Sequence, residues 1–169
     1  MLLTHAFTIE EVNNLSSENF VRIFGNVVEH LPAVAIVILK KRPFSEVRDI
    51  VNACFNYLDS LKLSEKLKVV QLYPDIIEKL TYLSQLHLEG DITGTDQLSI
   101  EEKRKLKELN NKYKEKFGFP FIKGSKEKYI WTIFSEIASR LENEVENEIQ
   151  VAFDEVKNIV KLRIHEIVR

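Results

Sequence analysis

The sequence predicts an all-α protein, a compact single-domain bundle of seven to nine helices over residues 1–169. Three observations lead to this prediction. Apolar residues recur at steps of three and four along most of the chain, as one buried face of a helix requires. The 169 residues include only 5 glycines and 4 prolines, which favours long regular elements with few turns. The composition, 44% hydrophobic and 30% charged, is that of a folded domain rather than a disordered chain.

Helix-start signals mark the first elements. Thr8 and Glu11 have the spacing of a capping box, in which each side chain bonds the other residue's backbone N–H. We expect a second helix to begin near Ser16 or Ser17 and to keep its apolar face until Pro32 ends or kinks it. The aliphatic run 33–39 suits either a buried strand or a short buried helix. Because no second strand is available to pair with it, we interpret it as a helix.

The next two helices have serine caps in this interpretation. Ser45 is the expected cap of a helix whose apolar face reaches Leu61. Ser64 is the expected cap of another that ends near Leu72, since the residue before Pro74 disfavours helix.

The second half of the chain follows the same periodicity. A helix is expected from Ile76 towards Leu88, followed by a loop over residues 89–96. A second capping box at residues 99–102 opens a long charged helix that Gly118 and Pro120 end. Two more helices are expected, over residues 130–141 and 145–167.

Composition excludes several functional classes. Lys and Arg total 24 and Asp and Glu 26, so the net charge of −2 argues against a nucleic-acid-binding protein. The single Cys54 and four scattered histidines offer no metal-binding motif, and no glycine-rich phosphate loop occurs. The longest aliphatic run is too short to span a bilayer. We therefore predict no metal, no membrane span and a cytoplasmic location.

Three features of the sequence are not explained by helix formation alone. Residues 117–122 place three phenylalanines around a glycine and a proline, which indicates either a core plug or the wall of a pocket. Arg163 lies on the apolar face of the last helix, so it pairs with a carboxylate, extends its head to solvent, or meets an anionic ligand. Asp75 follows Pro74, where a carboxylate suits the first turn of a helix.

Several of these stretches resemble the decarboxylases of urate degradation that act on 2-oxo-4-hydroxy-4-carboxy-5-ureidoimidazoline (OHCU). Residues 109–122 fit the pattern LNxxYxxKFGFPFI, the most specific motif. Residues 20–29, the Arg-Pro-Phe turn at 42–44, and residues 140–143, 148 and 162–163 are also similar to this family. The resemblance runs from about Asn14 to Val168. It implies an all-α fold, a homodimer, no cofactor and a small ureidoimidazoline-type ligand.

The resemblance also implies site residues, with two departures. Tyr73 stands where the family has its catalytic histidine, before Pro74 and Asp75. The family's SxxEQ motif is missing, and Glu89 falls about where its glutamate belongs. His87 is an alternative proton carrier if it converges with Glu89 in a loop. The substrate-binding positions implied are Pro74, Phe119, Phe121, Ile122, Lys123 and Arg163.

Two functions lead at this point, ahead of an enzyme with a different substrate on the same scaffold and of a purely structural helical adaptor. One is decarboxylation of OHCU to S-allantoin, with a site rearranged around Tyr73. The other is a catalytically inactive homologue that acts as a binding or regulatory protein, because tyrosine, with an ordinary pKa near 10, is a poor proton shuttle at neutral pH. A peroxisomal location is the alternative to the cytoplasm, although the chain ends Ile167-Val168-Arg169 rather than Ser-Lys-Leu.

Overall fold

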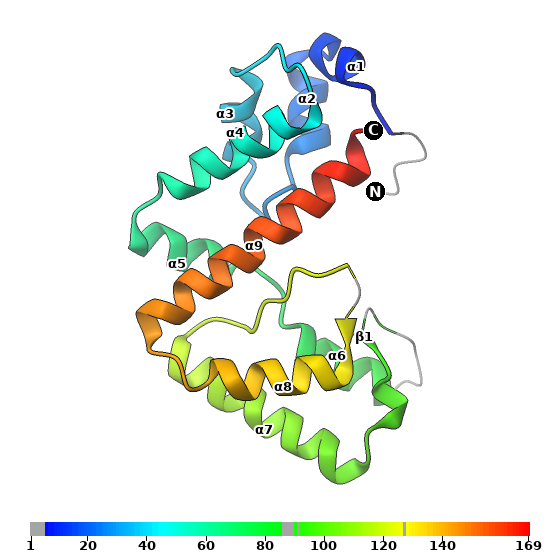
Figure 1. Cartoon of the computed structure of the whole chain (residues 1–169), viewed down its shortest axis with the longest axis vertical. Helices are drawn as coiled ribbons and strands as arrows, with labels where there is room; N and C mark the ends of the chain where they lie inside the picture. Colours follow the sequence, from blue (N-terminus) through cyan, green and yellow to red (C-terminus); the bar gives the residue numbers. More distant parts are fainter. Residues whose placement is uncertain (1–5, 86–89, 91, 127) are drawn as a thin grey trace. The chain divides into compact units, whose positions relative to one another are not determined.

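The described residues of the chain, in a computed structural model, are 6–85, 90, 92–126 and 128–169 (Figure 1). They form nine α-helices, one short 3₁₀ helix and two two-residue strands, which confirms the all-α prediction. The elements are α1 (Ile9–Asn14), α2 (Ser17–Phe24), α3 (Ala33–Leu39), α4 (Val47–Asp59), α5 (Leu63–Gln71), α6 (Ile76–Gln85), β1 (Ile92–Thr93), η1 (Thr95–Gln97), α7 (Ile100–Phe117), β2 (Lys128–Tyr129), α8 (Ile130–Arg140) and α9 (Val145–Ile167).

The chain divides into two compact units. The first unit comprises Met1–Val69 and Val156–Arg169, and the second comprises Val70–Glu155. Helix α9 therefore contributes its first part to the second unit and its last part to the first unit.

The first unit is built on amphipathic helices in consecutive contact. Helix α2 packs on α3, and α3 packs on α4. Fully buried side chains of these helices and of the last part of α9 make up the core of this unit: Phe20, Phe24, Val34, Ile38, Ile50, Leu58, Val156, Val160 and Ile164. The start of the chain is also fixed to its end, because the Phe7 N–H donates to the Ile167 carbonyl at 2.8 Å and the Arg169 N–H donates to the Phe7 carbonyl at 2.9 Å.

The Arg-Pro-Phe turn has a structural role in this unit. The Arg42 guanidinium donates through Nη1 to carbonyls at the end of α1, with the shortest contact at 2.6 Å to Leu15. Asn13 clamps Phe44 by two hydrogen bonds of 2.8 Å, one to its carbonyl and one from its N–H. Since a cation at a helix C-terminus also meets the negative end of the helix dipole, Arg42 both caps α1 and fixes the turn.

Three element boundaries differ from the sequence prediction. Helix α5 begins at Leu63, so Ser64, the expected cap, lies inside the helix, and the Glu65 carboxylate accepts the Lys62 N–H at 3.1 Å. Helix α2 ends at Phe24 with Gly25 as its C-cap, well before Pro32. The chain turns there because the Asn26 side chain accepts the His30 N–H and His30 adopts a positive φ of 51°. Helix α4 is capped by Glu46 rather than Ser45, since the Asp49 carboxylate reaches back to the N–H groups of both residues.

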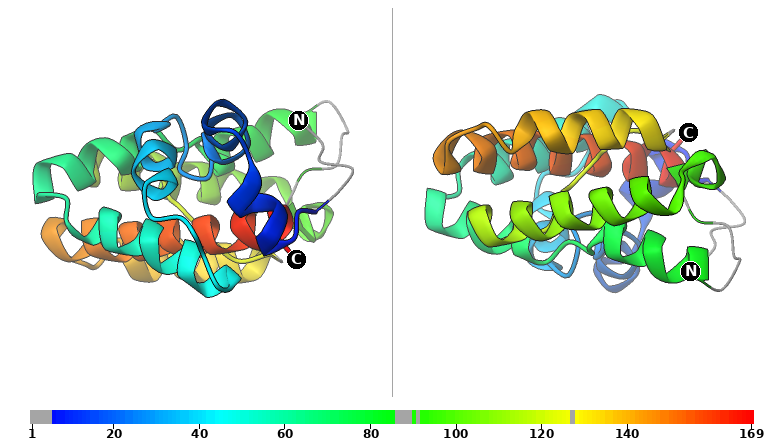
Figure 2. Two further views of the ribbon diagram at one scale, coloured as in Figure 1. Left: turned by 90° about the horizontal axis from the view of Figure 1, so that it is seen from above. Right: turned by 90° about the horizontal axis from the view of Figure 1, so that it is seen from below.

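The second unit contains a parallel pair of helices. Helix α7 packs on both α6 and α8, and α7 and α8 run side by side in the same direction (Figures 1 and 2). Two parallel helices need a return connection as long as the helix, about 27 Å for the 18 residues of α7. Residues 118–126 supply most of it, since nine extended residues reach about 30 Å. We call residues 118–126 the return segment.

A short parallel strand pair was not expected from the sequence. Strand β1 pairs with β2, with Ile92 opposite Lys128 and Thr93 opposite Tyr129. Two residues per strand carry too little periodicity for a sequence pattern to reveal them.

Candidate active site

Tyr73, Pro74 and Asp75 form the entry to α6 in the second unit. The Tyr73 N–H donates to the Val70 carbonyl at 3.3 Å, and the Tyr73 side chain is buried at 5% exposure. Asp75 caps α6, because its carboxylate accepts the Glu78 N–H at 2.9 Å. The sequence interpretation of Asp75 as a helix-start residue is therefore confirmed.

Asp75 also connects α6 to α7. Its carboxylate accepts from the Asn110 side-chain amide at 3.2 Å and from the Lys114 ammonium at 2.8 Å. Burial acts to raise the pKa of Asp75, but the hydrogen bonds from Glu78, Lys114 and Asn110 outweigh it, so the pKa lies below the ordinary value of 3.8. Asn110 is itself buried, and its Oδ1 has no hydrogen-bond partner among the described residues.

The aromatic stretch is a cluster in the core of the second unit. Helix α7 ends at Gly118, whose φ of 78° is the left-handed conformation that glycine adopts without strain. The Tyr113 ring contacts Phe117, Phe119 and Phe121 with centroid distances of 4.7, 5.9 and 5.6 Å. These phenylalanines and Ile122 are all buried. The structure thus favours the core-plug interpretation of this stretch.

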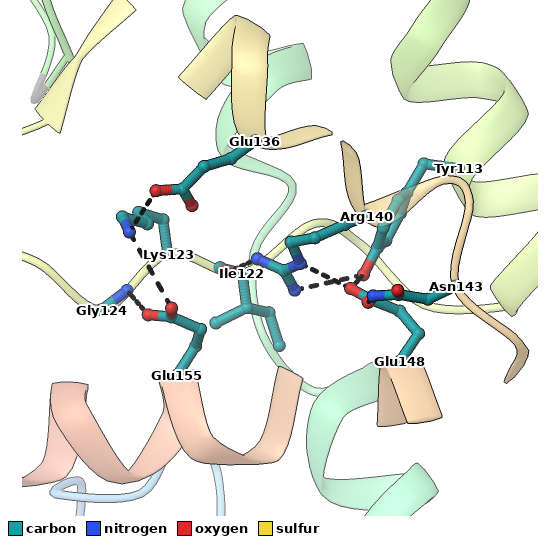
Figure 3. Close-up of polar contacts among 9 residues, drawn as sticks. All are labelled: Tyr113, Ile122, Lys123, Gly124, Glu136, Arg140, Asn143, Glu148 and Glu155. Atoms are coloured by element: carbon teal, nitrogen blue, oxygen red, sulfur yellow. Dashed lines mark hydrogen bonds and ion pairs between the residues drawn. The ribbon is translucent and has the colours of Figure 1, made fainter. Parts of the chain in front are cut away.

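Side chains from α8 and α9 hold the next residues of the return segment (Figure 3). The Ile122 carbonyl accepts from Arg140 Nη1 at 2.8 Å, and the Gly124 N–H donates to the Glu155 carboxylate at 2.7 Å. Lys123 lies between Glu136, at 2.7 Å, and Glu155, at 3.9 Å. The positive charge of Lys123 is therefore balanced by one carboxylate on each side.

A buried polar cluster lies behind the segment. Glu148 is fully buried, and its carboxylate accepts from Arg140 Nε at 2.6 Å, from the Tyr113 hydroxyl at 2.5 Å and from Asn143 at 2.8 Å. Burial raises the pKa of Tyr113 well above its ordinary value. The Arg140 charge opposes that rise, and the Glu148 hydrogen bond adds to it. Tyr113 is thus a neutral hydrogen-bond donor.

Two hollows adjoin the predicted site residues in this unit. One, of about 80 Å³, has Pro74 in its wall together with Ile76, Lys79, Leu80, Leu83, Gly90, Ile92 and Lys128. The other, of about 500 Å³, lies along the return segment and is lined by Thr93, Lys123, Ser125, Lys128, Tyr129, Thr132 and Ile133. Lys128 lines both hollows. Sequence reasoning missed it, because one lysine among 24 basic residues gives no signal without knowledge of β2.

Arg163 belongs to the first unit, where it is paired. Its Nη2 contacts the Glu29 carboxylate at 2.7 Å, and its Nη1 donates to the Asn26 carbonyl at 3.0 Å. Of the three alternatives for Arg163, the carboxylate pairing is the one observed. Its contact with a substrate stays a prediction.

Two predicted residues cannot be placed. Glu89 and His87 lie outside the described residues, so the position of a carboxylate partner for Tyr73 also stays a prediction. Over residues 6–85, 90, 92–126 and 128–169, no group of three or more His, Cys, Asp or Glu side chains is arranged to hold a metal ion. None of the helices built from these residues is long and apolar enough to cross a membrane.

Both the sequence and the all-α fold have known counterparts. The OHCU decarboxylase family matches residues 13–165, nearly the whole chain. The chain belongs to this family.

Particular relatives agree with that assignment. The chain is 36% identical over 160 residues to the 2-oxo-4-hydroxy-4-carboxy-5-ureidoimidazoline decarboxylase of Xenopus laevis, with 92% of this chain and 91% of the relative covered. It is 32% identical to the enzyme of the same name from Mus musculus, with 91% and 89% covered. The fold is similar to the crystal structure of (S)-allantoin synthase, with a TM-score of 0.80 at 19% identity; the match covers 96% of this chain and 54% of that one.

Proposed function

We propose that this chain decarboxylates OHCU to S-allantoin in urate degradation, without a cofactor. The observation that carries the proposal is the family match over residues 13–165, which contains the aromatic stretch and the return segment. Relatives named for this reaction cover about nine tenths of the chain at more than 30% identity.

The reaction needs three things from the protein. The leaving carboxylate must be held, the charge left on the imidazoline ring must be stabilised, and a proton must be delivered to one face. In the proposal the backbone of residues 119–123, in the second unit, meets the ring. Lys128 supports the charge stabilisation, since its side chain lines both hollows and forms no ion pair with any residue that the structure describes.

Tyr73 takes the proton-handling role in this proposal. Its phenol can both donate a proton and accept a hydrogen bond, so it can protonate the carbanion that forms on the substrate when carbon dioxide departs. Glu89, or His87 in its place, is proposed as the residue that orients the Tyr73 hydroxyl or returns a proton to it.

One observation favours a second candidate function. Tyr73 replaces the histidine that the resemblance implies as essential, and loss of a general acid–base group costs about 10²–10⁴ in rate. A homologue that keeps the pocket but not the chemistry would act as a binding or regulatory protein for the same ligand.

Variants of Tyr73 separate the two. OHCU is generated in place from urate, and the optical activity of the allantoin formed is followed by circular dichroism. If Tyr73 delivers the proton, Tyr73→Phe, which removes only the hydroxyl, lowers kcat about 10²-fold or more. If the chain is an inactive homologue, wild type and Tyr73→Phe are equally inactive. Activity that appears only in Tyr73→His then shows that the pocket survives and only the proton carrier was lost.

The remaining features complete the proposal. We propose that residues 1–169 work as one OHCU decarboxylase-like domain, in a homodimer, with a small ureidoimidazoline as ligand and neither nucleic acid nor membrane as partner. The cytoplasm is the proposed location, with the peroxisome as the alternative.

A further inference from the structure

Arg140 is a buried cation whose three guanidinium nitrogens all have partners. Only 7% of the residue is exposed. Nε donates to Glu148 at 2.6 Å, Nη1 to the Ile122 carbonyl at 2.8 Å, and Nη2 to the Tyr113 hydroxyl at 3.3 Å. The guanidinium carbon also lies 4.4 Å from the centre of the Phe121 ring. Arg140 therefore contacts the return segment twice, through a side chain and a carbonyl.

Glu148 fixes the direction in which Arg140 points. Its carboxylate is fully buried and is held from a second side by Tyr113 and from a third by Asn143 (Figure 3). A guanidinium is planar, so fixing its Nε edge on Glu148 also fixes where Nη1 lies. Glu148 and Tyr113 thus aim Nη1 at the Ile122 carbonyl.

Stability alone is a weak reason to bury such a cluster. Removing two charges from water costs free energy that their attraction often fails to offset, and apolar residues of similar volume often serve as well. The contact that apolar residues cannot replace is the hydrogen bond to Ile122. Residues 119–125 form neither helix nor strand, so no backbone ladder sets the position of this carbonyl.

We propose that Arg140 is a positioning residue that, oriented by Glu148 and Tyr113, holds the return segment in the conformation that binds substrate. The inference rests on the proposed function, since that function assigns substrate contacts to the backbone of residues 119–123. The 500 Å³ hollow along the same segment, with Lys123 and Ser125 in its wall, provides space for a ligand.

A triple variant tests this without leaving a buried charge. Tyr113→Phe, Arg140→Met and Glu148→Leu together replace the cluster by apolar side chains of similar size, so the melting temperature is expected to stay close to that of the wild type. The Kd for allantoin and the KM for OHCU are expected to rise at least about tenfold, with a smaller change in kcat, because a displaced binding segment loses ligand contacts. Hydrogen exchange of the amides of residues 121–126 is expected to accelerate, and that of α7 to stay unchanged.

Arg104→Met is the matched control, because it makes the same arginine-to-methionine change at an exposed ion pair within α7, where Arg104 lies 3.2 Å from Glu101. Wild-type affinity and exchange are expected for this variant. A folded triple variant with wild-type affinity, or with unchanged exchange in residues 121–126, would overturn the inference. The proposed function is judged on the wild type alone: no binding of allantoin and no turnover of OHCU by the intact chain would contradict it, whereas loss confined to the triple variant supports the positioning role.

Discussion

At Asp75 a single carboxylate serves three donors from two helices. The residue caps α6 through the Glu78 N–H and binds Lys114 and Asn110 of α7. The sequence predicts the first contact, because an acidic residue after proline is typical of a helix start. It does not predict the other two, since they depend on how α7 packs against α6.

The lowered pKa of Asp75 gives a pH-dependent prediction. A carboxylate with a depressed pKa in the folded state stabilises the fold above its unfolded pKa, and this contribution is lost as the pH falls through the folded value. Asp75→Asn should lower the free energy of unfolding by about 1 kcal/mol at pH 7. In urea titrations repeated at decreasing pH, the difference from wild type should shrink below about pH 4.

Asp59→Asn is the control for this experiment. Asp59 pairs with Lys157 at 2.9 Å, but half of its side chain is exposed, so solvent screens the pair. The expected loss is within about 0.5 kcal/mol at pH 7. A loss for Asp75→Asn that does not change with pH would show that its charge is not what stabilises the fold.

Arg163 and Arg140 show how far residue-level prediction reaches. The position of Arg163 on an apolar face correctly indicates that its charge needs a partner, and the partner proves to be Glu29, 134 positions earlier. Arg140 gives no such signal in isolation. Its partners come from Tyr113, Ile122 and Glu148, and only the fold brings them together.

Among the helices and strands, reciprocal capping boxes predict helix starts better than single serines do, and better than apolar spacing predicts helix ends. The capping boxes at Thr8 and Ser99 are both confirmed, because they depend on contacts within four residues. The predicted end of α2 is wrong. Val27 and Val28 continue the apolar spacing and are buried, but they lie in the turn that follows the helix. Apolar spacing therefore indicates which residues are buried, but it does not determine whether a helix or a turn buries them.

A pair of variants tests the cap of α7. The Ser99 hydroxyl accepts the Glu102 N–H at 3.1 Å, and the Glu102 carboxylate accepts the Ser99 N–H at 3.0 Å. Ser99→Ala should lower the free energy of unfolding by about 1 kcal/mol, while Ser99→Gly should cost only a few tenths. Chemical denaturation of the three proteins measures this. Equal losses for alanine and glycine would mean that the cap does not hold the start of α7.

The return segment is the element that sequence analysis placed least well. Its glycine, proline and phenylalanines indicate correctly that it is not a helix, and the choice between core plug and pocket wall stays open in the sequence. The structure favours the core plug, because the rings of Phe119 and Phe121 fill the core. Arg140 and Glu155 bond the backbone of Ile122 and Gly124, and the hollow is lined by the later residues Lys123 and Ser125.

At the scale of the whole molecule, the all-α class and the family are established by periodicity, by motif and by the match over residues 13–165. Activity depends on the two departures from the family pattern, Tyr73 and the missing SxxEQ motif. Tyr73 lies buried directly before α6, and its phenol replaces the imidazole that the resemblance implies.

The measurement that tests this most directly is the initial rate of S-allantoin formation by the intact wild-type chain. OHCU is generated in place, the circular dichroism of the product is followed, and the uncatalysed decay in the same buffer serves as the reference. An OHCU decarboxylase gives optically active S-allantoin at a rate proportional to protein concentration. A signal that stays at the uncatalysed level at every protein concentration would contradict the proposed activity and favour the inactive homologue.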